Sequence, residues 1–212
     1  MKYPAIILCL TILAFSCKKK ETSVEETTSP IPTTGSTYPA KDYIPLKYGS
    51  YWVYELTITD TNNVQVATTI DSSYVHDSSF VRGKWFYSIS GNIAVQGTYG
   101  DSSDYIIYND GTKMLSLKNN DTVATYSYSF TTYWYNLYMV MKTSPTTFAY
   151  NSQTYTNCVS RFNYMYGNMN PNCPNRIYQT TYSPGVGVVN AKYGYMNTCD
   201  IWEIKLLRYK VN

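Results

Sequence analysis

Short runs of alternating apolar and polar residues recur along most of this chain, and turn-forming residues separate them. In the run at 51–59, Trp52, Tyr54 and Leu56 alternate with smaller or more polar neighbours. An alternation with a period of two places every second side chain on one face of a β-strand. The Asn-Asp-Gly sequence at 109–111 lies between two such runs and is a strong signal for a tight hairpin. The pattern therefore predicts antiparallel strands joined by short turns.

Twelve segments show this strand pattern. The segment at 133–141 is the most helix-like, but its aromatic content and its lack of capping residues favour a strand. Ten or more short strands predict an all-β fold, an antiparallel meander that forms a barrel, a half-barrel or a sandwich. We expect the strands at residues 51–59, 64–75, 85–90, 93–99, 105–108, 112–117, 122–130, 133–141, 155–166, 177–182, 188–193 and 201–211.

The last of these segments contains a change of phase. Ile204 and Leu206 share one face of the expected strand, whereas Leu207 and Tyr209 follow the opposite alternation. A slip of one residue inside an apolar strand indicates an extra, unpaired residue. We therefore expect a β-bulge at Leu206 and Leu207.

The first 16 residues resemble a secretory leader. Lys2 gives a positive start, and residues 5–15 form an apolar run. The run is shorter than the roughly 20 residues that a spanning helix needs, which indicates a signal-peptide core. Residues 13–17, Leu-Ala-Phe-Ser-Cys, resemble a lipobox, the site where a bacterial signal peptidase cleaves before a cysteine that carries lipid. We expect a signal peptide at 1–16 and lipidation of Cys17.

A polar segment separates Cys17 from the strands. It is rich in Thr, Ser, Pro and Glu, and such a composition cannot offset the entropy of ordering by burial. This predicts a lipidated Cys and disordered tether at 17–37 and a single β domain at 38–212. The residue after Cys17 is Lys18 rather than the aspartate that marks inner-membrane retention in some bacteria. Lys18 therefore favours an anchor in the outer membrane, with the periplasmic or cell-surface side left open.

Two segments resemble the ends of a known group of proteins. Residues 43–54, Tyr-Ile-Pro-Leu-Lys-Tyr-Gly-Ser-Tyr-Trp-Val-Tyr, are similar to the opening of uncharacterised bacterial lipid-anchored lipoprotein domains. Residues 182–189, Tyr-Ser-Pro-Gly-Val-Gly-Val-Val, are similar to a segment near their ends. The resemblance brackets most of the domain and implies a β-rich, lipid-anchored fold with no catalytic residues. A looser similarity to lipoprotein-carrier half-barrels rests on architecture alone.

Residues that usually carry catalysis are scarce. His76 is the only histidine, and neither a Gly-x-Ser-x-Gly elbow nor a Cys-x-x-Cys pair occurs. Glu55 and Glu203 are the least implausible carboxylate pair for glycoside cleavage, but the alternation puts both on solvent faces. We therefore expect no catalytic residue, no metal, no cofactor and no enzyme activity. The domain has no run of basic residues, which argues against a nucleic-acid partner.

Five cysteines occur in the chain. Cys9 leaves with the leader and Cys17 takes lipid, so three remain in the domain. In an oxidising compartment, three cysteines allow one disulfide and one free thiol, or an intermolecular bridge. We expect a disulfide between Cys158 and Cys199, which leaves Cys173 free in a polar loop.

Tyrosine is unusually frequent, with 25 in 212 residues. Most of these rings suit packing across the strands of a half-buried sheet. The alternative is a surface on which a ligand stacks, and Tyr133, Trp134 and Tyr135 are the candidates for it.

These features favour a non-catalytic module of the cell envelope that binds a protein or a surface polymer. One alternative is a carrier of a lipophilic ligand in a half-open β-barrel; a core filled solid by Trp52, Trp202, Ile204 and Leu206 would argue against it. Another alternative is a glycan-binding module, which needs exposed aromatic rings in one row. The expected partners are the membrane, through the N-terminal lipid, and an envelope protein, a glycan or a lipophilic ligand.

Overall fold

The computed structural model describes residues 36, 38–92, 95–102, 104–129, 134–168, 173, 177–194 and 199–212. The expected signal peptide at 1–16 lies outside the described residues. So do Cys17 and the expected tether, apart from Ser36. Lipidation, the tether and the domain boundaries therefore stay predictions.

Within these residues the chain forms one short 3-10 helix and twelve strands. In the part of the chain that the structure describes, no helix has both the length and the hydropathy of a membrane span. The elements are η1 (Ala40–Tyr43), β1 (Tyr51–Thr59), β2 (Gln65–Val81), β3 (Lys84–Gly91), β4 (Gly97–Ser102), β5 (Tyr105–Tyr108), β6 (Lys113–Ser116), β7 (Thr122–Ser129), β8 (Trp134–Tyr150), β9 (Gln153–Asn168), β10 (Tyr178–Ser183), β11 (Gly187–Gly194) and β12 (Ile201–Lys210).

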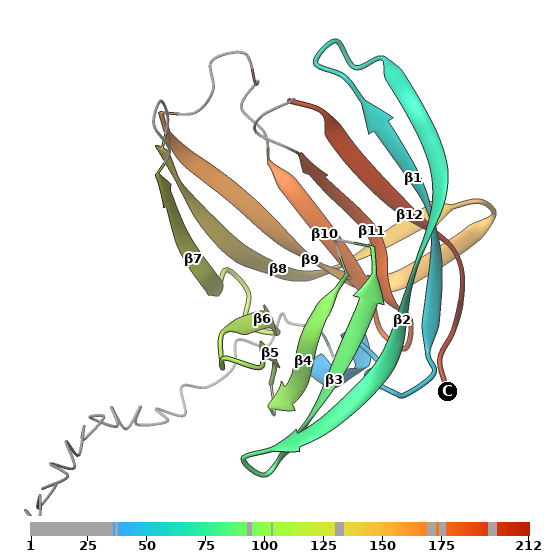
Figure 1. Cartoon of the computed structure of the whole chain (residues 1–212), viewed down its shortest axis with the longest axis vertical. Helices are drawn as coiled ribbons and strands as arrows, with labels where there is room; N and C mark the ends of the chain where they lie inside the picture. Colours follow the sequence, from blue (N-terminus) through green and yellow to red (C-terminus); the bar gives the residue numbers. More distant parts are fainter. Residues whose placement is uncertain are drawn as a thin grey trace, which may run out of the picture. The chain divides into compact units, whose positions relative to one another are not determined.

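The twelve strands form one antiparallel sheet in the order β6-β5-β4-β3-β2-β1-β12-β11-β10-β9-β8-β7. Consecutive strands pair throughout, except that β6 and β7 form the two edges and β1 pairs with β12. The sheet curls into a nearly closed barrel (Figure 1). The predicted all-β fold and antiparallel meander are confirmed, and of the three expected forms the chain takes the barrel.

The barrel has two halves, because not every strand runs its full length. The strand β3 pairs with residues 73–81 of β2, whereas residues 65–72 of β2 pair with β1 alone. Strands β3–β6 therefore close the barrel only at the end where η1 and the C-terminus lie (Figure 1). We call this end the closed half. In the remainder, the open half, only the eight strands from β7 round to β2 continue the sheet.

Large side chains fill the inside of the closed half. Trp52 is 2% exposed, and Tyr54 and Leu206 are 0% exposed. The indole N–H of Trp52 donates to the carbonyl of Val186 at 2.5 Å, and the hydroxyl of Tyr54 donates to the carbonyl of Val188 at 3.2 Å. Because the polar atoms of both rings are satisfied, the burial of their apolar surface stabilises the fold with little opposing cost.

The predicted bulge in the last strand is confirmed. Val53 lies opposite Arg208 and Tyr54 lies opposite Leu206, so Leu207 is the extra residue. Leu206 is fully buried, whereas Leu207 is half-buried. The slip lets the strand keep apolar residues inside the barrel on both sides of the bulge.

The hairpin of β8 and β9 is longer than the sequence predicts. The expected strands end at 141 and begin again at 155, but pairing continues to Tyr150 and Gln153. Asn151 and Ser152 make the turn, with φ angles of 49° and 63°. The tip reaches β1 and β12, since the hydroxyl of Tyr150 donates to Glu55 and the amide of Gln153 donates to the carbonyl of Leu207.

A disulfide joins Cys173 to Cys199. The predicted bridge between Cys158 and Cys199 is wrong, and so is the expectation that Cys173 is free. Cys158 lies in the part of β9 near the hairpin tip, and its thiol is fully buried. Cys173 follows the other end of β9, and Cys199 precedes β12, so both belong to loops at the open half of the barrel. The strand order brings those two loops together and keeps Cys158 apart from both.

Candidate functional site

The residues predicted as a stacking surface do not form one row. Trp134 and Tyr135 are neighbours on β8, and successive side chains of a strand lie on opposite faces. Trp134 is 50% exposed, while the ring of Tyr135 stacks on Tyr128 of β7 with centroids 4.9 Å apart. Tyr133 lies outside the described residues. The expectation of a shared exposed face therefore fails for Trp134 and Tyr135.

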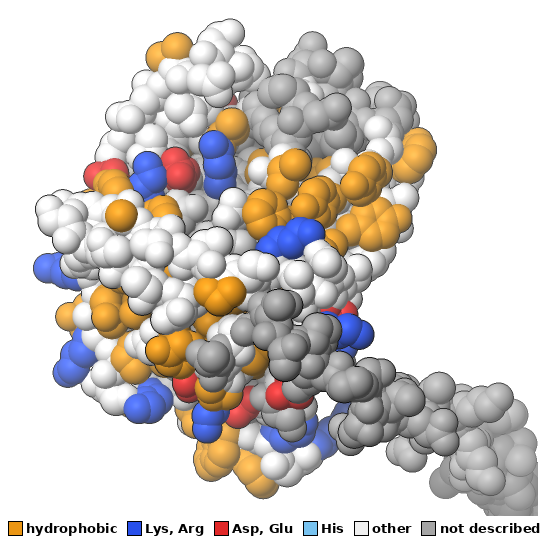
Figure 2. Space-filling view, turned by 180° about the vertical axis from the view of Figure 1, so that it is seen from behind, with side chains coloured by type: hydrophobic (Ala, Val, Ile, Leu, Met, Phe, Trp, Pro, Cys, Tyr) orange, Lys and Arg blue, Asp and Glu red, His pale blue; other side chains and the backbone are white. Residues whose placement is uncertain are grey.

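A different set of rings gathers on the face of β8 and β9 that carries Trp134. Tyr138, Tyr164 and Tyr166 line a shallow hollow of about 450 Å³ beside Lys142. The rings of Tyr138 and Tyr166 meet edge to face with centroids 5.6 Å apart. Figure 2 views the molecule from behind and shows hydrophobic side chains gathered next to basic ones on part of this surface. The alternation of aromatic residues at every second position was the sequence signal for this group.

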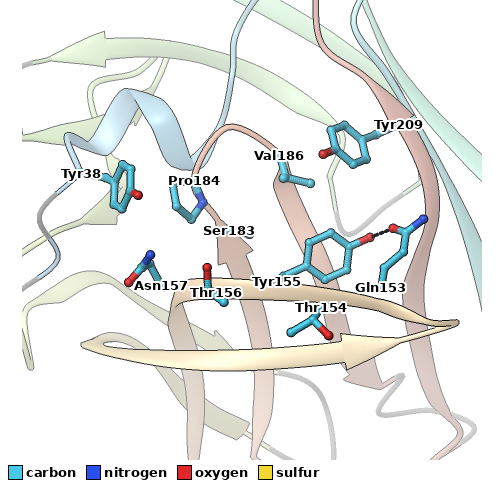
Figure 3. Close-up of a pocket in the computed structure, with 10 residues that line it drawn as sticks. All are labelled: Tyr38, Gln153, Thr154, Tyr155, Thr156, Asn157, Ser183, Pro184, Val186 and Tyr209. Atoms are coloured by element: carbon cyan, nitrogen blue, oxygen red, sulfur yellow. Dashed lines mark hydrogen bonds between the residues drawn. The ribbon is translucent and has the colours of Figure 1, made fainter.

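A second hollow, of about 520 Å³, lies beside the tip of the β8–β9 hairpin (Figure 3). The segment before η1, the hairpin, the β10–β11 turn and β12 all contribute to its lining. Tyr38, Tyr155 and Tyr209 stand around it, and Tyr38 and Tyr209 are 38% and 40% exposed. The amides of Gln153 and Asn157 also line it, and the hydroxyl of Tyr155 donates to Gln153. These residues come from separate stretches of the chain, so no local sequence pattern predicts the hollow.

The lining of the Figure 3 hollow is neutral. Its described lining residues supply rings, amides and hydroxyls, and none of these described residues is an Asp, Glu, Lys, Arg or His. Burial raises the pKa of Tyr155, and Tyr209 and Cys158 add smaller contributions in the same direction, so the Tyr155 hydroxyl keeps its proton at neutral pH. These groups can donate and accept hydrogen bonds, but none of them is a general base for a nearby hydroxyl. The hollow therefore offers rings, amides and hydroxyls to a ligand.

The side chains on the inner face of the sheet are buried in the closed half and only half-buried in the open half. On β9, Arg161 is buried, while Asn163 and Met165, which follow it on the same face, are half-buried. On β12, Ile204 is fully buried and Trp202 is half-buried. Cross-strand pairing places further half-buried residues on this face of the open half: Ile58, Leu137, Met139 and Tyr193. Apolar and aromatic side chains inside the open half thus remain partly accessible.

Arg161 lies where the two halves meet. Its guanidinium donates to the carbonyl of Met114 at 3.3 Å and to the hydroxyl of Tyr108, and it also faces Tyr99 and Tyr182. Its Nε atom is buried without a hydrogen-bond partner. The ion pairs among the described residues are Lys113–Asp121 and Lys205–Glu203, and neither includes Arg161.

The groups around Arg161 do not balance its charge. Burial lowers the pKa of Arg161, but its interactions with Tyr182, Tyr108 and Tyr99 raise the pKa by more, so the guanidinium stays charged. Burial also raises the pKa values of Tyr99 and Tyr182, so both hydroxyls stay neutral at physiological pH. The sequence pattern did not mark Arg161 as buried, because the alternation places it with Asn163 on the face opposite Phe162 and Tyr164.

The residues considered for catalysis are separated or already paired. His76 lies exposed in the middle of β2, with its ring near Tyr74. Glu203 accepts a hydrogen bond from Asn190 at 3.2 Å and pairs with Lys205 at 3.4 Å, while Glu55 accepts one from Tyr150. Among the described residues, no three His, Cys, Asp or Glu side chains are grouped as metal ligands would be.

Comparisons with known proteins add little. No protein-family model matches the chain, and no curated protein matches it. A solved structure of a protein inferred to be a lipoprotein, from Parabacteroides distasonis, is 12% identical, covers 82% of this chain and 100% of its own, and has a TM-score of 0.42. A protein inferred to be exported, with a YmcC-like fold, from Bacteroides fragilis, is 11% identical, covers 83% and 99%, and has a TM-score of 0.36. At these TM-scores nothing about this chain follows from either similarity.

Proposed function

We propose that the protein is a lipid-anchored module of the bacterial cell envelope that binds a ligand and catalyses no reaction. The leader, Cys17 and the polar tether support the anchoring, and Lys18 after Cys17 supports the outer membrane as its site. The neutral hollow of Figure 3 supports binding without catalysis, because its groups can recognise a ligand but have no acid or base beside them.

The ligand that suits this hollow is a carbohydrate. A sugar ring has an apolar C–H face that packs on an aromatic ring, and its hydroxyls exchange hydrogen bonds with amides. Tyr38 and Tyr209 offer partly exposed rings, and Gln153 and Asn157 offer amides that can both donate and accept. The presence of partly exposed aromatic rings and amides in one hollow is the main observation that supports a carbohydrate ligand.

Tyr209→Ala tests the carbohydrate site. We expect it to weaken the binding of an envelope oligosaccharide about tenfold, because a stacked ring contributes on the order of 1 kcal/mol beyond its buried area. Isothermal titration calorimetry against a panel of neutral and acidic oligosaccharides measures this. Tyr48→Ala is the matched control, since Tyr48 is 67% exposed and does not line the hollow. Equal affinities for the two variants, or no binding by the unmodified protein, would contradict the proposal.

A carrier of a lipophilic ligand is the second candidate, and the inner face of the open half favours it. The closed half is filled by Trp52, Ile204 and Leu206, which leaves no room there for a ligand. Trp202, in contrast, belongs to the open half and is half-buried. A carrier built on this fold would hold its ligand in the open half alone. Native mass spectrometry of the gently purified protein would reveal a co-purifying mass that extracts into organic solvent.

A further inference from the structure

We propose that the open half binds an amphiphile whose negatively charged head group, a carboxylate or a phosphate, pairs with Arg161. The apolar tail would lie along the inner face beyond it. The inference rests on the carrier function and gives that carrier a chemical class of ligand.

The charge of Arg161 has no counter-charge in the described part of the chain. A buried guanidinium is costly unless an opposite charge or a full set of hydrogen bonds compensates it. Arg161 is 7% exposed, its Nε has no partner, and the groups around it are a carbonyl and tyrosine hydroxyls. A carboxylate or phosphate would supply the missing negative charge and accept hydrogen bonds from the planar guanidinium.

The packing around Arg161 differs between its two sides along β9. On the closed side, the next residue of the same face is Val159, which is fully buried, and Tyr182, which pairs with it, is fully buried too. On the open side the next residue of the same face is Asn163, which is half-buried and has a buried Oδ1 without a partner. Of these two unpaired atoms, the Nε of Arg161 is a donor and can bind an anion, whereas the Oδ1 of Asn163 is an acceptor, so Asn163 could bind an anion only through its amide N–H groups. A head group entering from the open half would meet Asn163 first and Arg161 at the end of its path.

Apolar and aromatic side chains follow Arg161 on the inner face of the open half. Met139 and Leu137 of β8 pair directly with Asn163 and Met165 of β9, and Trp202 lies on the same inner face. These side chains are half-buried although they are apolar or aromatic. From Arg161 to Met165 the strand rises roughly 13 Å, at about 3.3 Å per residue, which suits a medium-length alkyl chain. A tail in this position would bury apolar surface that the fold leaves accessible.

Binding of dodecanoate, dodecyl phosphate, dodecanol and inorganic phosphate tests the proposal. The full mature chain carrying Cys17→Ser takes no lipid and can be titrated without detergent. We expect the two anionic amphiphiles to bind and dodecanol to bind about 10- to 100-fold more weakly, since a charged hydrogen-bonded pair is lost. Arg161→Met should lower the affinity for dodecanoate by the same factor. Lys192→Met removes a charge from an exposed position of β11 and should leave that affinity unchanged.

The outcomes separate the possible failures. If dodecanol binds as tightly as dodecanoate and Arg161→Met has no effect, the carrier function stands and the anionic head group is wrong. If no amphiphile binds, the carrier function fails as well. If inorganic phosphate binds as tightly as dodecyl phosphate, the site holds a free anion, and the amphiphile is overturned.

A second variant tests the tail without removing the charge. Met165→Trp adds bulk to the inner face of the open half and should weaken dodecanoate at least tenfold while inorganic phosphate is unaffected. The melting temperature of ligand-free Arg161→Met gives an independent check, because removal of an uncompensated buried charge should not lower it. A large fall in that temperature would mean that the fold itself compensates the guanidinium, and would overturn the proposal.

Discussion

The closed and open halves of the barrel are built from the same strands, yet their inner faces differ in burial. Trp52 and Trp202 lie on the inner faces of paired strands, β1 and β12. Trp52 is 2% exposed and its indole N–H is bonded to Val186, whereas Trp202 is half-buried. The difference arises because η1 and β3–β6 complete the barrel around Trp52, while β2 and β7 leave the sheet open beyond Trp202. Stability explains the apolar residues of the closed half; those of the open half need a second reason.

The largest expected effect separates these two tryptophans. Trp52→Ala should lower the free energy of unfolding by about 3–5 kcal/mol, because it leaves a cavity in a packed core and an unpaired carbonyl at Val186. Trp202→Ala should cost less than half as much, because its ring gives up less buried surface. Urea denaturation followed by circular dichroism measures both. Equal losses would show that the open half is as tightly packed as the closed half.

The next effect concerns the disulfide, which belongs to the open half. The double variant Cys173→Ser, Cys199→Ser should lower the free energy of unfolding by roughly 3 kcal/mol, because the unfolded chain is no longer cross-linked over their sequence separation of 26. Hydrogen exchange should rise at the ends of β9 and β12 in the open half and stay unchanged around Trp52. Exchange that rises equally in both halves would show that the halves do not open separately.

Cys158 supplies the control for that experiment. Its thiol donates to the carbonyl of Tyr155 at 3.4 Å, and burial raises the pKa of the thiol. A thiol reagent should therefore not modify Cys158 in the folded protein and should modify it after unfolding. Rapid labelling under native conditions would contradict the packing beneath the β8–β9 hairpin.

The same comparison shows which features the sequence could predict. The limits of β1 and the bulge at Leu207 follow from alternation, because a period of two is a local property of the chain. The far part of the β8–β9 hairpin was missed because register shifts between Lys142, Thr146 and Phe148 interrupt the alternation there.

Contacts across the barrel could not be predicted from the sequence, for a different reason. Which loops meet at Cys173 and Cys199 depends on the order of strands in the sheet, and that order is not local. The same holds for the burial of Arg161. The tyrosines of β4, β5 and β10 that surround it come from separate parts of the chain.

The smallest expected effect concerns the contact that holds the β8–β9 hairpin against β1. The hydrogen bond to Glu55 raises the pKa of Tyr150 to about 12, with smaller contributions from burial and from the charge of Glu55. The pKa of an unfolded tyrosine is about 10. A folded-state pKa above the unfolded value means that the contact stabilises the fold fully below about pH 10 and that this contribution is lost as the pH rises through the folded pKa. Because the pair is partly exposed, we expect it to contribute about 1 kcal/mol or less.

Glu55→Gln tests this contact. It should move the pKa of Tyr150 toward 10 and reduce the loss of stability at alkaline pH. Ultraviolet titration of the protein minus that of Tyr150→Phe isolates the one ring among the 25 tyrosines. Hydrogen exchange in the open half should not respond to either variant if the hairpin braces only the closed half. A Tyr150 ring that already titrates near 10 in the unmodified protein would mean that the hairpin tip is held by its other contacts, through Gln153 and Leu207.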